Sequence, residues 1–153
     1  MNSDYLDLLS AFCANGVEFL VVGAHALAAH GHVRATKDLD VWVRPTEENA
    51  VRVLAALQEF GAPLHDLGLK DLSEPGIVFQ IGVAPLRIDI MTDIDGVRFE
   101  EAWPCRIEAR FGELQIHVLS REHLIRNKRA SGRLQDRADL ERLDEIGQEP
   151  TGA

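Results

Sequence analysis

Two aspartates at alternate positions on an apolar run are the residues of this chain best suited to do chemistry. Asp38 and Asp40 alternate with Leu39 and Val41. In a strand, both carboxylates would point to one face while the leucine and the valine point into the protein. Two like charges this close raise each other's pKa unless a cation neutralises them, and carboxylate oxygens are preferred ligands of Mg²⁺, which commonly accompanies nucleotide phosphates. The pattern therefore indicates a metal and phosphate site, and the alternative is a solvated strand end with two surface acids.

A glycine turn lies upstream of these acids. Residues 17–22 have the composition of a buried strand, the strand is interrupted at Gly23, and residues 24–29 are strong helix formers that end at Gly31. A glycine at such a turn lets the backbone approach a ligand, and the first N–H groups of a helix attract an anion. A strand, a glycine turn and a helix in this order predict a phosphate at the turn.

The loop between this helix and the acidic strand carries further polar groups. Arg34, Thr36 and Lys37 lie directly before Asp38. We therefore expect hydrogen-bond donors and carboxylates at one edge of the sheet.

Together these residues resemble the nucleotidyltransferase superfamily related to DNA polymerase β, especially its minimal prokaryotic and AbiEii-like members. That signature is an apolar strand ending in Gly-Gly or Gly-Ser, a short helix, two acids separated by one apolar residue, and a third acid on a later strand. Arg34 and Thr36 fall where AbiEii-like members show R-x-T. The signature positions in this chain are Gly23, Ala24, Asp38, Asp40 and the candidate third acid Asp89.

The resemblance implies a metal-dependent enzyme that moves a nucleoside monophosphate from an NTP to a hydroxyl of a small molecule, an RNA or a protein side chain. Asp38 and Asp40 would hold two Mg²⁺ ions, with Mn²⁺ as the alternative, while Asp89 would bind the catalytic ion and act as the base. The other interpretation of Asp89 is a strand acid paired with Arg87 or Arg98. Ala24 stands where the family has Gly or Ser, so only its backbone N–H is left for a phosphate. The implied nucleotide contacts are Gly23, Ala24, Arg34, Thr36, Lys37 and Lys128.

Two other classes of function fit parts of the pattern. One is an inactive transferase fold that binds a partner, for example as an antitoxin, and Ala24 motivates it. The other is a nuclease or a glycosyltransferase that uses the paired acids for a metal. The glycine turn favours the nucleotidyltransferase over a nuclease, because a nuclease does not require a triphosphate cradle.

Composition bounds these hypotheses. The chain has 153 residues, of which 46% are apolar and 27% charged, typical of one globular domain, assigned to residues 1–149 with a flexible tail at 150–153. The net charge of −9 argues against general DNA binding. No apolar run approaches a membrane span and the N-terminus is acidic, so we expect a cytoplasmic protein with no membrane contact. Cys13 and Cys105 are expected to be reduced, buried thiols.

The C-terminal part of the chain has the opposite charge. Residues 121–142 contain seven Lys or Arg against four Asp or Glu, a net charge of +3, which leaves −12 for the rest. Such a region suits a phosphorylated ligand, and the alternative is a solvated helix with i, i+4 pairs. Lys128 and Arg133 are the candidate contacts in it, with Asp136 and Asp139 orienting them. Lys128 is expected to be exposed and to contribute little to folding.

Periodicity predicts the elements that position these residues. The expected fold class is α/β (α+β), a mixed sheet flanked by helices with C-terminal helices, in one domain. Residues 61–76 are expected to form a loop that lies over the site. Helices are expected at 3–15, 24–29, 46–60, from Ser120 to Ser131 and then to about Ile146, and strands at 17–22, 38–43, 77–83, 86–91, 106–111 and 114–119.

Overall fold

The computed structural model describes residues 3–36, 38–64, 66–82 and 86–148. Six strands form one mixed sheet in the order β3-β4-β2-β1-β6-β5, with β1 antiparallel to β2, and with β1–β6 and β2–β4 parallel. A mixed sheet flanked by helices is the predicted fold class. The strands are β1 (Phe19–Val22), β2 (Asp38–Val43), β3 (Val78–Ile81), β4 (Arg87–Met91), β5 (Ile107–Phe111) and β6 (Leu114–Val118).

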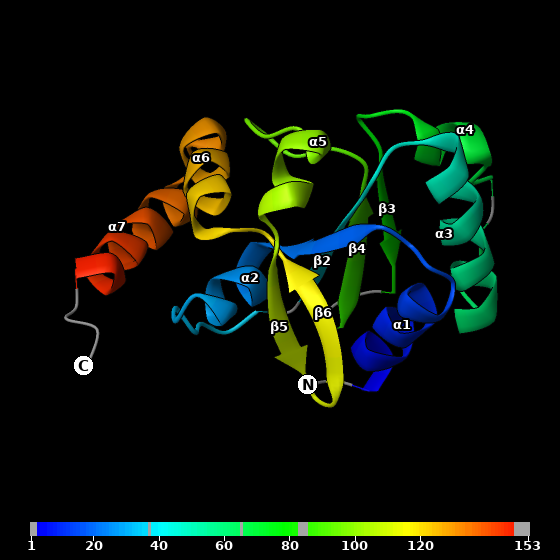
Figure 1. Ribbon diagram of the computed structural model, residues 1–153, viewed down its shortest axis with the longest axis horizontal. Coiled ribbons are helices and arrows are strands. Elements are labelled where there is room, and N and C mark those ends of the chain that lie inside the picture. The colour runs from blue at the N-terminus through cyan, green and yellow to red at the C-terminus, as the bar shows by residue number, and fades with distance from the viewer. Residues whose placement is uncertain (1–2, 37, 65, 83–85, 149–153) are drawn as a thin grey trace.

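Helices α1, α3 and α4 gather at one end of the sheet and α6 and α7 at the other, with α2 and α5 between the two groups (Figure 1). One group packs α1 against α3 and α3 against α4, and the other pairs α6 with α7 near the C-terminus. The helices are α1 (Ser3–Ala14), α2 (Gly23–Ala29), α3 (Glu47–Phe60), α4 (Leu69–Ser73), α5 (Phe99–Ala102), α6 (Arg121–Ser131) and α7 (Leu134–Gln148), with a 3-10 turn η1 (Trp103–Cys105) after α5.

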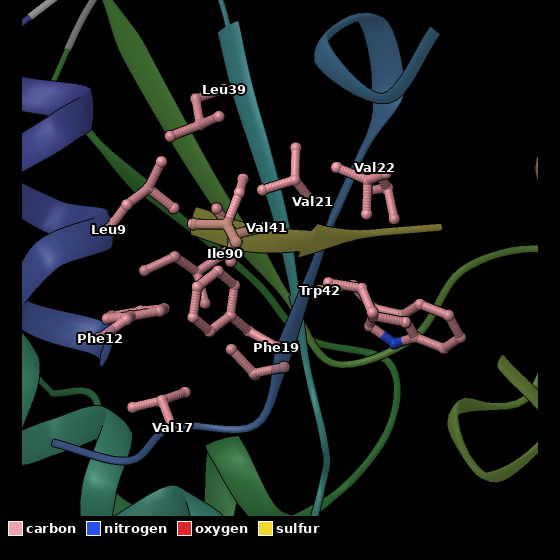
Figure 2. Close-up of a cluster of buried hydrophobic side chains, with 14 of the residues drawn as sticks. Leu9, Phe12, Val17, Phe19, Val21, Val22, Leu39, Val41, Trp42 and Ile90 are labelled. Atoms are coloured by element: carbon pink, nitrogen blue, oxygen red, sulfur yellow. The ribbon is translucent and has the colours of Figure 1, made fainter. Parts of the chain in front are cut away.

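The apolar core fixes which face of β2 is left for chemistry. Leu39 and Val41 are fully buried on the side of the sheet that faces α1, where Leu9 and Phe12 lie (Figure 2). Trp42 points the other way, and its ring meets that of Phe99 at 5.0 Å between centroids. Alternation along β2 therefore turns Asp38 and Asp40 away from the α1 side, as the sequence predicted.

Three local predictions failed. The segment 61–76 is not wholly a loop, because α4 forms within it and packs on α3. Helix α5 and the turn η1 were not predicted, since four and three residues are too short to show a period. Cys13 and Cys105 are exposed rather than buried. The strands predicted at 77–83 and 86–91 form β3 and β4, which pair antiparallel. Residues 83–85 between them and the tail at 150–153 lie outside the described residues.

A buried amide ties α3 to the ends of two central strands. Thr46 caps α3 by accepting from the Asn49 backbone N–H at 3.3 Å. The Asn49 side chain, 2% exposed, accepts from the Glu18 N–H at 2.8 Å and donates to the carbonyls of Glu18 and Arg44 at 3.0 Å each. One side chain thus satisfies three backbone groups beside β1 and β2. No helix among the described residues is long and apolar enough to cross a membrane.

Replacing this amide should weaken the whole fold. Asn49→Leu keeps the branched shape and the number of heavy atoms but leaves three backbone groups without partners, so we expect a loss of about 2–4 kcal/mol in the free energy of unfolding. Urea unfolding measures it. Val51→Ala on the exposed side of the same helix is the control and should change stability by less than about 0.5 kcal/mol. Equal effects of the two substitutions would contradict the anchoring role.

Candidate active site

Neighbouring parallel strands bring the three predicted acids together. In the register of β2 and β4, Asp40 lies opposite Asp89 and Asp38 lies opposite Arg87. Paired residues share one face of the sheet, so all three carboxylates lie on the same side. Asp89 is 7% exposed, while Asp38 and Asp40 are partly buried. The strand that carries Asp89 thus lies directly beside the strand of the first two acids.

An arginine occupies the space between the first and third acids. Arg87 Nη2 donates to Asp38 Oδ2 at 3.0 Å and to Asp89 Oδ2 at 3.1 Å. Arg87 Nε also lies 3.0 Å from Asp89 Oδ1, but the N–H is misdirected, so these two buried atoms have no hydrogen bond within the described chain. The pair between Asp89 and Arg87 considered from the sequence is therefore present, and it extends to Asp38.

The second acid lies against the glycine turn. A Cβ at Gly23 would sit 2.2 Å from Asp40 Oδ2, and Gly23 has φ +67°, so a side chain is excluded both by space and by backbone. Burial, followed by the charges of Asp89 and Asp38, raises the pKa of Asp40 to about 6. Arg87 and Lys128 offset only part of this. An added cation would therefore favour the charged form of Asp40.

These groups open into a cavity of about 710 Å³. Two sets of opposite charge line it: acids from β2 and β4 and the segment after β4, and cations from the 32–36 loop and the C-terminal helices. No described residue of the segment 61–76 lines this cavity, so that segment is not its cover. The predicted residues on the cavity wall are Gly23, Ala24, Arg34, Thr36, Asp38, Asp40, Asp89, Lys128, Arg133 and Asp136; Lys37 lies outside the described residues. Residues that the sequence did not assign to the site are Arg87, Asp93, Asp95, Asn127 and Gln135.

Lys128 is buried, which corrects the expectation of an exposed lysine. It is 5% exposed, and its Nζ lies 3.0 Å from Asp136 Oδ1 and 3.1 Å from Asp139 Oδ2. Helices α6 and α7 fold back on each other after Gly132, at φ +66°, which brings the two aspartates onto the lysine. Burial tends to raise the pKa of Asp136, yet hydrogen bonds from Ser131, Lys128 and Arg133 lower it to about 2.

Asp139 connects α7 to the loop that precedes β2. It is fully buried and accepts hydrogen bonds from Gln135 Nε2 at 2.9 Å and from Arg34 Nε at 3.2 Å. The ring of His32 contacts the same carboxylate, with Nε2 at 3.1 Å from Oδ1. Thr36 Oγ1 instead meets the backbone of Asp38, 3.2 Å from both its N and its O. The R-x-T stretch is therefore held at one end by α7 and at the other by the start of β2.

As they stand, the carboxylates are organised around protein cations. No three acidic, histidine or cysteine side chains in the described ranges are placed to hold one metal ion. The site nevertheless has the oxygen donors that a hard divalent cation prefers, including the buried Asp89 Oδ1 without a hydrogen bond. The arrangement combines an acidic wall, a cationic wall and a glycine turn around one cavity.

Comparison with known families agrees with this geometry. Residues 1–152 match the family described as nucleotidyl transferase of unknown function (DUF2204). The chain belongs to this nucleotidyl transferase family. The superfamily inferred from the sequence is confirmed at this level, and no match was found among curated proteins.

Solved structures share the fold of this nucleotidyl transferase. The lincosamide antibiotic adenylyltransferase LnuA, solved with lincomycin bound, gives a TM-score of 0.60 at 14% identity, covering 95% of this chain and 98% of its own. The antibiotic-resistance factor ANT(2'')-Ia gives 0.59 at 15% identity, covering 94% and 87%. A candidate nucleotidyltransferase from Thermotoga maritima gives 0.57 at 18% identity, covering 95% and 96%. At these identities the likeness is one of fold.

The raised pKa of Asp40 predicts a pH-dependent stability of the metal-free protein. Its folded pKa of about 6 lies above its ordinary value of 3.8, so the folded state holds the proton more tightly. The resulting penalty is absent below 3.8, grows as the pH rises, and is complete above 6. Asp40→Asn should therefore raise the melting temperature in EDTA at about pH 7.5, and the gain should vanish near pH 4. The exposed Asp93→Asn is the control, and a gain independent of pH would contradict the assignment.

The buried lysine predicts a large loss of stability. Lys128→Met leaves Asp136 and Asp139 buried without their shared cation, so we expect a loss of about 3–5 kcal/mol. Chemical unfolding checks it, with Arg129→Met, the exposed neighbour on α6, as the matched control. If Lys128→Met were as mild as Arg129→Met, the ion pairs would not stabilise the α6–α7 pair.

Proposed function

We propose that this protein transfers a nucleoside monophosphate from an NTP to a hydroxyl acceptor with the help of Mg²⁺, or of Mn²⁺ in its place. The observation that carries the proposal is the register that sets Asp40 opposite Asp89 beside Asp38, on one wall of a cavity whose other residues include Gly23 and Lys128. Family membership supports nucleotidyl transfer, and the R-x-T stretch bound to α7 supports an AbiEii-like subgroup.

The residues fit a divalent ion by their chemistry. Asp40 has a raised pKa, and Asp89 keeps one buried oxygen without a hydrogen bond. Asp38, Asp40 and Asp89 would hold the ion. Bound there, it would neutralise triphosphate charge and lower the barrier to displacement at phosphorus.

The chain's own residues then have separate tasks. Asp89 accepts the proton of the acceptor hydroxyl while the hydroxyl oxygen forms a bond to the α-phosphorus of the NTP. Pyrophosphate leaves as the bond between the α-phosphorus and the α–β bridging oxygen breaks. Lys128 uses two of its three N–H donors on Asp136 and Asp139, which leaves one for a phosphate oxygen. Arg34 Nη1 and the Ala24 backbone N–H are further phosphate contacts on the same wall. The hydroxyl of Thr36 positions the start of β2 instead.

For the acceptor we propose a small polyhydroxylated molecule. LnuA was solved with lincomycin, and ANT(2'')-Ia was solved with adenylyl-2''-tobramycin, both on this fold.

A second candidate function is an inactive fold that binds a protein partner. Ala24, without a hydroxyl, and the guanidinium already between Asp38 and Asp89 favour it.

Calorimetry with each NTP, with Mg²⁺ and with EDTA, separates the two functions. Binding only with Mg²⁺ is expected, because bare carboxylates repel a triphosphate. Equal affinity in EDTA would overturn the metal-dependent site. Absence of binding under every condition would favour the inactive module.

The roles of the acids are separated by substitution. Asp89→Asn should retain Mg-NTP binding but lose transfer by about a hundredfold or more, since general-base catalysis is typically worth 10² to 10⁴. Asp40→Asn should lose both, and Asp93→Asn on the same cavity wall should keep both. Affinity is measured beside pyrophosphate release and label transfer from an α-labelled NTP, with lincomycin and tobramycin among the acceptors. If Asp89→Asn transferred the label at the wild-type rate, Asp89 would have only a structural role.

A further inference from the structure

Arg87 is placed where a bridging cation would be. Its Nη2 lies 3.0 Å from an oxygen of Asp38 and 3.1 Å from an oxygen of Asp89, so one nitrogen joins carboxylates from two strands. Arg87 is two residues before Asp89 on β4 and therefore shares its face of the sheet. The guanidinium offsets one of the two negative charges of the acids that, with Asp40, form the metal site of the proposed function.

This placement has a geometric consequence. Both carboxylates are turned toward the guanidinium, and no three acidic side chains in the described chain are arranged to share an ion. Arg87 Nη2 holds one oxygen of each of the two carboxylates, and its Nε lies 3.0 Å from the second oxygen of Asp89, so a metal ion that takes these oxygens replaces contacts of the guanidinium. The two cations therefore compete, because both are attracted to the same pair of carboxylates.

The cavity also offers space for the displaced side chain of Arg87. Its side chain is 36% exposed and lines the cavity that contains Gly23 and Ala24. A partly exposed ion pair is weak enough to exchange, whereas a long side chain can reorient within the cavity without moving the strand. A displaced guanidinium would lie among groups suited to a triphosphate, for which its planar donors are well matched.

We propose that Arg87 is an exchangeable counter-ion: it holds Asp38 and Asp89 in the metal-free protein, is displaced when the divalent ion binds, and then contacts the triphosphate. The inference rests on the proposed function for the identity of both ligands. It gives Arg87 opposite effects on two equilibria, since the side chain opposes binding of the ion alone and favours binding of the nucleotide. An arginine with only a structural role would favour both binding of the ion and binding of the nucleotide.

Affinities of Arg87→Gln test this exchange. For Mn²⁺ alone, followed by its paramagnetic resonance signal, affinity should increase by about fivefold or more, as expected from removing a partly exposed ion pair that competes. For ATP at saturating Mg²⁺, affinity should fall by about fivefold or more, because charge-assisted donors to phosphate are lost. Any other combination overturns the exchange.

Matched variants separate this effect from the general loss of a charge. Arg87→Lys should keep Mn²⁺ affinity near that of the wild type, because a cation remains beside the acids. Arg133→Gln removes another cation of the same cavity, one that pairs with Asp136, and should change Mn²⁺ affinity by less than about twofold. An increase in Arg133→Gln as large as in Arg87→Gln would overturn the exchange in favour of a field effect.

A measurement on the wild-type protein covers the case in which Arg87→Gln does not fold. The nitrogen resonance of Arg87 Nε should shift as Mg²⁺ is added, and an unchanged resonance under saturation would overturn the displacement. Failure of the proposed function looks different. If neither wild type nor Arg87→Gln binds Mn²⁺, the metal site itself is absent, whereas binding by the wild type without a gain in Arg87→Gln rejects only the exchange.

Discussion

The close approach of like-charged carboxylates across β2 and β4 is the constraint on which the site depends. The register sets Asp40 opposite Asp89, and Asp38 lies beside them on the same face. Burial and, after it, repulsion by Asp89 and Asp38 raise the pKa of Asp40, and the guanidinium of Arg87 offsets part of the cost. Gly23 matters for the same reason, because any side chain there would collide with Asp40. Each of these features follows from concentrating negative charge at one point.

The core on the opposite face holds this unfavourable arrangement in place. Leu39, Val41 and Ile90 alternate with the acids and are fully buried. A slip of one residue in either strand would turn the apolar set to the cavity and the carboxylates into the core, which costs far more than their mutual repulsion. Burial of the apolar residues therefore fixes the strand register that aligns the acids. The hydrogen bond from the Asn49 amide to the Arg44 carbonyl supports this register at the far end of β2.

Local patterns in the sequence predicted the acids and most elements, but not the partners of the charged groups. Alternation along residues 38–43 determines the shared face of Asp38 and Asp40 without any tertiary information. The position of Arg87 between two acids depends on which strand lies beside β2, and the hydrophobic periodicity of a sequence does not determine the order of strands. Burial of Lys128 was missed because helix α6 is polar overall, and only its packing on α7 brings two aspartates onto one lysine. The three bonds of Asn49 likewise join segments distant in sequence.

The two cations nearest the acids differ in a way that decides what each can do. Lys128 has a side-chain exposure of 7% and two buried aspartates as partners, so moving it would leave uncompensated charges in the interior. Arg87 is 36% exposed, and water can replace part of what its partners provide. The ammonium group of Lys128 is therefore a fixed donor, and it does not have to reorganise when a phosphate binds. The arginine is the one cation of the pair that the site can release, so a change of occupant at the carboxylates has to involve Arg87 rather than Lys128.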